Sequence, residues 1–270
     1  MERIKKALQL AAQERGTADV VGFAESGVDE KPSSNQAEET ASFEYLHTRV
    51  LDVPKGSLVS ARVIDGHGQD SFTRAYKLLR TQVLQRLAKE GWQTVAVASP
   101  VAGEGKTLTA INLAVSIANA PNHTSLLVDL DWHQPSVHQY FNYRPEFDIR
   151  DYLRGEQPLS AVLVNPGLPC FCLLPCREPV ADSSEQLAAL GGLVRELKGR
   201  YRNRIVIFDL PPLLATDDAL SFLPFVDCVL LVVEEGKTKR EHILRSIELV
   251  GEDRLLGTVM NKSRERLPLY

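Results

Sequence analysis

The sequence predicts an α/β fold in which helices cover both faces of a parallel β-sheet. Six short runs are rich in Val, Ile and Leu, and they are apolar at successive positions. Strands of that kind are buried on both faces, as in parallel sheets. Amphipathic helical patterns separate most of these runs, and 44% of the 270 residues are hydrophobic. A chain of this length can therefore bury one large core between two layers of helices.

The strands and helices follow in a regular order along the chain. Strands are expected at residues 94–98, 125–130, 170–174, 204–209, 228–233 and 256–260. Helices are expected at residues 72–87, 106–118, 184–200, 217–223 and 240–250. The alternation of the two element types is typical of a sheet built from strand–helix–strand units.

The chain divides into four parts by composition. Residues 1–15 hold Ile4, Ala7, Leu8 and Ala11 at helical spacing and predict an amphipathic helix. Residues 16–70 are rich in Gly, Ser, Asn, Asp and Glu with little periodicity, and predict a flexible arm with short ordered pieces at most. Residues 71–266 form the expected single domain, and residues 267–270 form a tail.

Charge and hydropathy exclude two classes of partner. The net charge of −4 provides no basic field for nucleic acid, so no nucleic-acid partner is expected. The apolar runs are strand-length and far shorter than the roughly 20 residues that span a bilayer. Because no secretory signal is visible either, a cytoplasmic location is expected.

Three of the four cysteines lie close together, at Cys170, Cys172 and Cys176. Cys170 and Cys172 would share one face of a strand, as core residues do. No nearby histidine or second cysteine pair completes a zinc set, so core packing is the favoured interpretation.

The segment Ser99–Thr107 carries the first chemical motif, since it follows a predicted strand and opens a predicted helix. A glycine-rich loop before a helix presents several backbone N–H groups to phosphates, while a lysine adds charge and a hydroxyl reaches Mg²⁺. Pro100 stands where a P-loop usually has its first glycine. The residues expected to contact the nucleotide are Gly103, Glu104, Gly105, Lys106, Thr107 and Leu108. The motif predicts an ATP site, with Mg²⁺ held in part by Thr107.

Carboxylates follow two further strands. Asp129 and Asp131 end the run Leu126–Asp131 and would point to one side; one of them is expected to orient the nucleophile, and Asp131 to contact the metal. A structural cap of the following turn is the alternative for such a pair. Asp209 ends the run Ile205–Asp209 and is a candidate metal-binding acid. Ligand sites in open parallel sheets lie at these carboxyl ends, so all three acids should meet the loop.

Two polar groups nearby have simpler explanations. Asp217 and Asp218 begin a predicted helix, where a carboxylate favours the helix dipole. Asn261 follows the last strand, and its amide could contact the adenine edge or cap the loop.

Together these motifs resemble the bacterial tyrosine autokinases of exopolysaccharide and capsule loci, in particular the exosortase-associated branch. The resemblance covers about Phe72 to Arg266 and includes Ala102–Thr107, Ala110–Ala114, Arg204–Asp209 and Pro211–Thr216; the opening Ile4–Leu8 also looks like that branch. It implies a P-loop fold of the deviant Walker type, with Lys106 and Thr107 in Walker A, Asp129 and Asp131 in Walker A′ and Asp209 in Walker B. Lys106, Asp129 and Asp131 are then the expected catalytic residues.

The resemblance also implies transfer of the ATP γ-phosphoryl group to tyrosine. It further implies a membrane polysaccharide co-polymerase as partner, which could recruit the protein to the inner face of the cell membrane, and a homo-oligomer.

The chain departs from the family pattern in three places. Arg74 and Lys77 occupy positions where the subunit-contact helix usually has glutamate and arginine, which weakens the expectation of a ring. His133 and Gln134 follow Asp131-Trp132 where the family has arginine. The family's C-terminal tyrosine cluster is reduced to Tyr270, which is a candidate phosphoacceptor.

Two alternative functions remain at this point. One is a nucleotide-dependent scaffold or plain ATPase whose kinase activity has decayed, which His133 and the missing cluster favour. The other is a positioning ATPase of the septum-site or partitioning type. Those proteins carry a signature lysine five residues before the P-loop lysine, and Val101 stands there in this chain.

Overall fold

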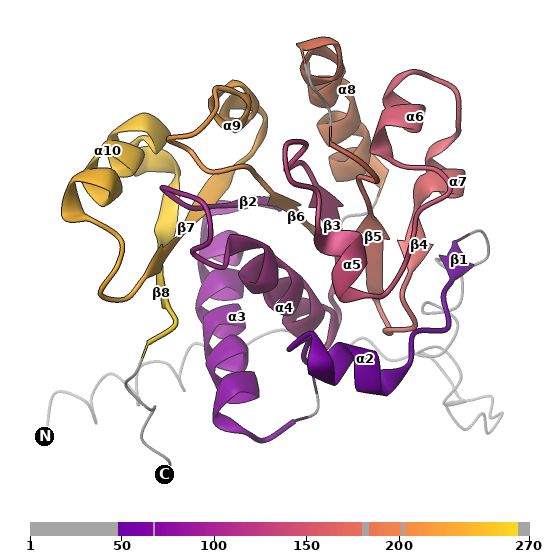
Figure 1. Cartoon of the computed structure of the whole chain (residues 1–270), viewed down its shortest axis with the longest axis horizontal. Coiled ribbons are helices and arrows are strands. Elements are labelled where there is room, and N and C mark those ends of the chain that lie inside the picture. Colours follow the sequence, from indigo (N-terminus) through magenta and orange to yellow (C-terminus); the bar gives the residue numbers. More distant parts are fainter. Residues whose placement is uncertain (1–47, 67, 180–183, 201–202, 264–270) are drawn as a thin grey trace, which may run out of the picture. The chain divides into compact units, whose positions relative to one another are not determined.

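The computed structural model describes residues 48–66, 68–179, 184–200 and 203–263. They form a sheet with the strand order β1-β4-β5-β3-β6-β2-β7-β8 (Figure 1). The strands are β1 (Arg49–Val50), β2 (Thr94–Ala98), β3 (Thr124–Asp129), β4 (Val164–Asn165), β5 (Phe171–Leu174), β6 (Arg204–Asp209), β7 (Cys228–Glu234) and β8 (Leu255–Asn261). The predicted N-terminal helix, residues 16–47 of the arm and Tyr270 lie outside the described residues.

The sheet is parallel except at one pair. The short β4 runs antiparallel to β5, where Val164 lies opposite Leu173. The two parallel neighbours β3 and β6 place Asp129 opposite Asp209 at their carboxyl ends. The predicted α/β class with a largely parallel sheet is thereby confirmed.

The helices divide between the two faces of the sheet. The long ones are α3 (Ser71–Glu90), α4 (Lys106–Ala118), α8 (Ser184–Arg200) and α10 (Arg240–Val250). The short ones are α2 (Lys55–Ser60), α5 (Val137–Tyr140), α6 (Ile149–Leu153), α7 (Leu159–Val162) and α9 (Asp218–Phe222), with 3₁₀ turns at Leu223–Phe225 and Glu252–Arg254. One core cluster joins α2, α3, α4 and α5 to the sheet, and the other joins α6 to α10 (Figure 1).

Strand alternation explains the two clusters. In β2, Val95 and Val97 belong to the core under α3 and α4, whereas Ala96 and Ala98 belong to the core under α8 and α10. All four are fully buried, as expected for a strand covered on both faces. Successive side chains point to opposite faces, so one apolar run supplies both layers.

Helix α3 shows why the predicted helix boundaries hold to within a few residues. Asp70 caps its start by accepting a hydrogen bond from the Thr73 N–H at 3.0 Å. Gly91 ends it in the left-handed region with φ 70°. Both are standard helix signals.

The chain before residue 71 contributes to the domain more than its composition suggests. Helix α2 is ordered, and Leu58, Val63 and Ile64 are buried in the core beneath α3 and α4. The six residues of α2 show too little periodicity to be predicted, because tertiary contacts stabilise this helix rather than local pattern. Strands β1 and β4 and helices α5, α6 and α7 were missed for the same reason.

Candidate functional site

The loop between β2 and α4 lies at the carboxyl end of the sheet and forms the base of the site. Gly103 and Gly105 have φ values of 82° and 90°, which side chains rarely adopt. A Cβ on Gly105 would also lie 2.1 Å from the Asn261 side-chain nitrogen. Both glycines are therefore required by the path of the loop, as the motif predicts.

The backbone N–H groups of residues 103–108 make no hydrogen bond to any other residue that the structure describes. The first hydrogen bond after this stretch runs from the Thr109 N–H to the Gly105 carbonyl, at 3.0 Å. Unsatisfied donors at a loop and helix N-terminus form an anion site, since they and the helix dipole both favour negative charge. The donor set suits the phosphates of a nucleotide.

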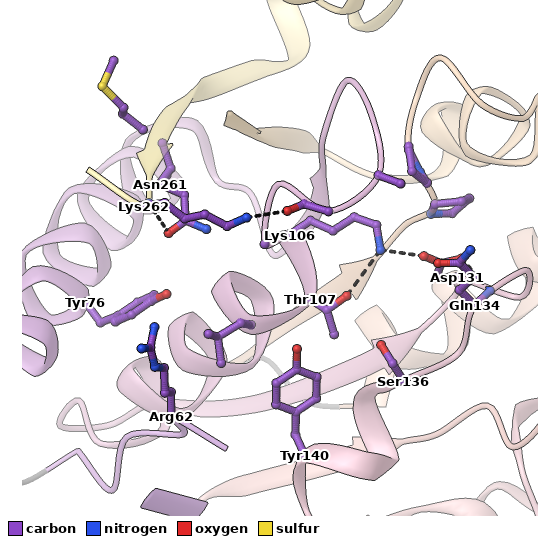
Figure 2. Close-up of a pocket in the computed structure, with 18 of the residues that line it drawn as sticks. Arg62, Tyr76, Lys106, Thr107, Asp131, Gln134, Ser136, Tyr140, Asn261 and Lys262 are labelled. Atoms are coloured by element: carbon purple, nitrogen blue, oxygen red, sulfur yellow. Dashed lines mark hydrogen bonds and ion pairs between the residues drawn. The ribbon is translucent and has the colours of Figure 1, made fainter. Parts of the chain in front are cut away.

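Lys106 lies at the centre of this site, and its side chain is buried. The Lys106 Nζ donates to Asp131 Oδ2 at 2.6 Å and lies 3.7 Å from Asp209 Oδ1. It also lies 3.3 Å from the Thr107 hydroxyl (Figure 2). Burial alone would lower the pKa of Lys106, but the charges of Asp209 and Asp131 outweigh it and raise the pKa. The ammonium group is therefore charged at neutral pH.

Asp209 is fully buried, and neither of its carboxylate oxygens has a hydrogen-bond partner in the described part of the chain. Burial raises the pKa of Asp209 to about 6, although the charge of Lys106 opposes this shift. A buried carboxylate without hydrogen bonds is costly. Its oxygens keep the capacity to accept a hydrogen bond from a donor that reaches them, although the side chain does not line the cavity.

Asp129 differs from Asp131 in its surroundings. Strand β3 ends at Asp129, so the two carboxylates do not share one strand face as the alternation predicts. Asp129 Oδ1 accepts from the Asp131 N–H at 3.2 Å, and Oδ2 accepts from the Val137 N–H at 3.1 Å. Burial and the charge of Asp209 raise the pKa of Asp129. Asp129 therefore stabilises the segment between β3 and α5 through these two hydrogen bonds, as the turn-capping alternative describes.

A cavity of about 1210 Å³ opens above the loop. Of the predicted residues it is lined by Gly103, Gly105, Lys106, Thr107, Leu108, Asp131 and Asn261, whereas Glu104, Asp129 and Asp209 lie behind its wall. The Glu104 side chain is 1% exposed; it accepts hydrogen bonds from the Val101 N–H at 3.3 Å and from the Thr238 hydroxyl. Only the backbone of Glu104 can face a nucleotide.

Sequence reasoning missed several residues that line the cavity. Arg62, from the segment after α2, Tyr76 of α3 and Tyr140 of α5 all line it (Figure 2). Burial raises the pKa of Tyr76 and of Tyr140, so both remain protonated phenols at neutral pH. Nothing local in the sequence marks these positions, because they approach the loop only through packing of α3 and α5 against α4.

His133 and Asp218 form a contact across the cavity rim. His133 Nε2 lies 2.9 Å from Asp218 Oδ2, and the Asp218 side chain is largely buried. Asp217 precedes α9 but makes no side-chain capping hydrogen bond. The interpretation of Asp218 as a helix-start residue was therefore incomplete, since its carboxylate also holds the imidazole that stands in place of the family's arginine.

Arg74 and Lys77, the two residues of α3 that depart from the pattern of the tyrosine autokinases, are not buried. Arg74 is exposed, and the Lys77 Nζ donates to the Gly68 carbonyl at 2.9 Å within the same chain. Leu78 next to them is 52% exposed.

The side-chain oxygens around the phosphate loop match what Mg²⁺ binds in proteins. The described residues contain no group of three or more His, Cys, Asp or Glu side chains arranged to hold a metal. Mg²⁺ instead keeps several waters and binds one or two protein oxygens together with phosphate oxygens. The Thr107 hydroxyl, the Asp131 carboxylate and the unpartnered Asp209 oxygens fit that requirement.

The cysteines and the helices add two observations. Cys172 and Cys176 are buried, Cys170 is partly buried, and none forms a disulfide.

No helix in the described ranges is long and apolar enough to cross a membrane.

The strand order and the phosphate loop give this chain the fold of P-loop proteins of the deviant Walker type. Solved structures with this fold include the kinase domain of Escherichia coli tyrosine kinase ETK, with TM-score 0.67 and 21% identity over 83% of this chain and 88% of that one. The chimerical protein CapA2B2 matches with TM-score 0.69 and 23% identity, over 80% of this chain and 94% of that one. The septum site-determining protein MinD from Pyrococcus horikoshii, solved with Mg-ADP, matches with TM-score 0.52 and 20% identity over 65% and 74% of the two chains.

Within that class, curated relatives of the chain are named as tyrosine-protein kinases and polysaccharide proteins, which confirms the resemblance. The tyrosine-protein kinase YwqD of Bacillus subtilis is 28% identical over 69% of this chain and 79% of its own length. The succinoglycan biosynthesis transport protein ExoP of Rhizobium meliloti is 26% identical over 86% of this chain. The matched part spans only 28% of ExoP. No family model matches the chain.

Proposed function

We propose that this domain binds Mg-ATP and transfers its γ-phosphoryl group to tyrosine, as an autokinase that regulates exopolysaccharide production. The observation that carries the proposal is the set of unsatisfied N–H groups at residues 103–108 around a charged, buried Lys106. Relatives named as tyrosine-protein kinases support the reaction class.

The residues divide into phosphate-binding and metal-binding groups. The loop N–H groups and the Lys106 ammonium would hold the β- and γ-phosphates, since phosphoryl transfer depends mainly on positioning and charge neutralisation. The Thr107 hydroxyl and the Asp131 carboxylate would hold Mg²⁺, with Asp209 orienting a metal-bound water. The metal ion neutralises charge on the transferred phosphoryl group.

Asp131 is the better placed of the two predicted bases. Its carboxylate lines the cavity, whereas both oxygens of Asp129 accept backbone hydrogen bonds. When the nucleotide's phosphates bind the Lys106 ammonium, its 2.6 Å hydrogen bond to Asp131 can lengthen or break. Asp131 can then orient the acceptor phenol and accept its proton, while the phenolic oxygen bonds to the γ-phosphorus and ADP leaves. Asp129 is a positioning residue in this scheme.

The direct test follows the label of γ-labelled ATP. Purified wild-type protein with Mg²⁺ is expected to incorporate label on tyrosine, and Lys106→Met is expected to incorporate none. Mass spectrometry then locates the phosphotyrosine. Label in free phosphate alone would overturn the kinase proposal and leave an ATPase.

Tyr270 is proposed as the acceptor. Tyr270→Phe should remove phosphotyrosine if this residue is the principal site, with nucleotide affinity unchanged. Label that persists on Tyr76, Tyr140, Tyr143 or Tyr152 would retain the kinase and reject the tail as acceptor.

A second candidate is a nucleotide-dependent scaffold or plain ATPase, which His133 favours. An imidazole lacks the permanent charge that a guanidinium has beside phosphates. Intact ATP binding without phosphotyrosine on any residue would support this candidate.

A positioning ATPase is less well supported. The fold is shared with MinD, but Val101 stands at the position of the signature lysine of that group. A side chain without charge there cannot contact the nucleotide's phosphates in the way a lysine does.

For the cellular setting we propose a membrane polysaccharide co-polymerase as partner, recruitment to the inner face of the membrane, and assembly into homo-oligomers. The relative named as a succinoglycan biosynthesis transport protein supports this context. Co-purification with a membrane polysaccharide co-polymerase, and light scattering of the purified chain, would test the two statements separately.

A further inference from the structure

Residues from the end of β8, which also line the cavity, hold the phosphate loop by hydrogen bonds to its carbonyl groups. The Asn261 side chain donates to the Glu104 carbonyl at 2.8 Å. The Lys262 Nζ donates to the Gly103 carbonyl at 2.7 Å (Figure 2). These carbonyls belong to the two peptide groups that lead into Gly105. Two consecutive peptide groups of the loop are therefore bonded to a segment about 160 residues away in sequence.

The geometry of the peptide bond connects these contacts to the phosphate site. A peptide group is planar and trans, so its C=O and N–H point in opposite directions. Fixing the Gly103 carbonyl therefore fixes the Glu104 N–H in the opposite direction, and fixing the Glu104 carbonyl does the same for the Gly105 N–H. Both N–H groups belong to the stretch without partners among the described residues.

Lys262 is itself fixed from several directions. Its Nζ lies 2.8 Å from Glu234 Oε2, and its backbone N–H donates to Asn261 Oδ1 at 2.8 Å. Its φ of 56° lies in the left-handed region, which a lysine adopts only when its surroundings impose it. Glu234, at the end of β7, thus orients the ammonium group towards the loop.

We infer that Lys262, oriented by Glu234, is a positioning residue that sets the direction of the loop N–H groups and thereby the affinity for the nucleotide's phosphates. The inference rests on the proposed nucleotide site but not on the kinase reaction. Lys262 also lines the cavity, but its ammonium group is bonded to the Gly103 carbonyl, and it acts on the loop through that carbonyl. Loss of Lys262 therefore weakens the binding of every nucleotide whose phosphates the loop N–H groups hold. The effect is the same for a diphosphate and for a triphosphate.

The test measures the dissociation constants of Mg-ADP and Mg-ATP by calorimetry for wild type and Lys262→Met. The variant is expected to bind both nucleotides about tenfold more weakly and by the same factor, because charged hydrogen bonds of this kind contribute on that order. Lys262→Arg should recover most of the affinity. Glu234→Gln should give a smaller loss, because the ammonium keeps its contact with the loop but loses its charged partner.

Lys237→Met is the matched control. Lys237 Nζ lies 3.1 Å from the same Glu234 oxygen but makes no contact with the loop among the described residues. Its removal changes the local charge equally, and nucleotide affinity should stay at the wild-type value. Circular dichroism and the thermal midpoint of the nucleotide-free variants should match wild type.

Three outcomes would overturn the inference. Wild-type affinity in folded Lys262→Met would remove the positioning role. A loss for Mg-ATP that exceeds the loss for Mg-ADP would assign Lys262 to direct contact with the γ-phosphate. An equal loss in Lys237→Met would reduce the effect to general charge. If the wild type binds neither nucleotide, the proposed function fails, and the inference fails with it.

Discussion

The two ends of the sheet hold aspartates in opposite states, and Asp209 is fully buried whereas Asp227 is partly buried. Asp209, at the carboxyl end of β6, lies 3.7 Å from the Lys106 Nζ, but neither of its carboxylate oxygens accepts a hydrogen bond in the described chain, and its pKa is raised to about 6. Asp227, just before the amino end of β7, accepts from the backbone N–H groups of Gln93 and Thr94, each at 2.9 Å, and from Lys198 at 2.7 Å. Burial alone would raise the pKa of Asp227, but these hydrogen bonds hold it below its usual range.

The difference separates structural from functional carboxylates. A buried carboxylate whose hydrogen bonds are satisfied stabilises the fold, because each donor would otherwise lose its partner. A buried carboxylate without partners is destabilising unless a ligand completes it. Asp227 is therefore expected to affect stability and Asp209 to affect the bound metal. The predictions below test this contrast.

The largest effect is expected from Lys106→Met at the carboxyl end. The variant removes the buried cation that pairs with Asp131 and would neutralise the phosphates, so Mg-ATP affinity should fall at least ~100-fold. The fold should persist, because methionine fills a similar volume. Calorimetry together with circular dichroism measures both. Unchanged affinity in a folded variant would contradict the assignment of the phosphate site.

The second largest effect is expected from Asp209→Asn, which should reduce turnover by about two orders of magnitude. Nucleotide should still bind, because the amide keeps the shape of the side chain, but the dependence on Mg²⁺ should weaken. A Mg²⁺ titration of turnover measures this. Turnover and Mg²⁺ dependence equal to wild type would place the metal-water role elsewhere.

Asp227→Ala should produce the reverse result. It leaves two backbone N–H groups and Lys198 without their acceptor, so the free energy of unfolding should fall by about 2–3 kcal/mol. Mg-ATP affinity should be unchanged, since the site lies at the other end of the sheet. Urea denaturation measures the loss, with the exposed Asp253→Ala as the control for removing a carboxylate. A large loss of nucleotide affinity in a stable Asp227→Ala protein would break the contrast.

The smallest effect concerns pH in the nucleotide-free protein. The folded pKa of Asp209 lies above its unfolded value, so between about pH 4 and pH 6 the folded state binds more protons and this group's contribution falls as pH rises. Asp209→Asn should therefore be more stable than wild type at pH 7, by on the order of 1 kcal/mol, and equal to it near pH 4.

The folded pKa of Asp227 is lowered, so its contribution is present above about pH 4 and is lost as pH falls below that value. The cost of Asp227→Ala should accordingly shrink in acid. Urea denaturation across this pH range measures both slopes. Parallel slopes for the two variants would contradict the opposite states of the two carboxylates.

Much of the fold follows from local pattern. The runs 94–98 and 204–209 match β2 and β6 residue for residue, and the segments 106–118, 184–200 and 240–250 match α4, α8 and α10. Each is long enough, or apolar enough, for its periodicity to identify it. Short elements such as β1, β4 and α5 could not be predicted, because packing against the domain holds them in place.

The site divides in the same way. The sequence alone determined the loop with Lys106 and Thr107, and it placed acids at the ends of two strands, because turn chemistry and strand alternation act over a few residues. Only the tertiary structure decided that Asp131 faces the cavity while Asp129 braces the loop, since β3 ends between them. It also decided that Asp218 holds His133 and that Lys262 holds Gly103, 85 and 159 residues apart in sequence. Those partners meet because parallel strands bring distant strand ends to one edge of the sheet, and no local pattern encodes such a meeting.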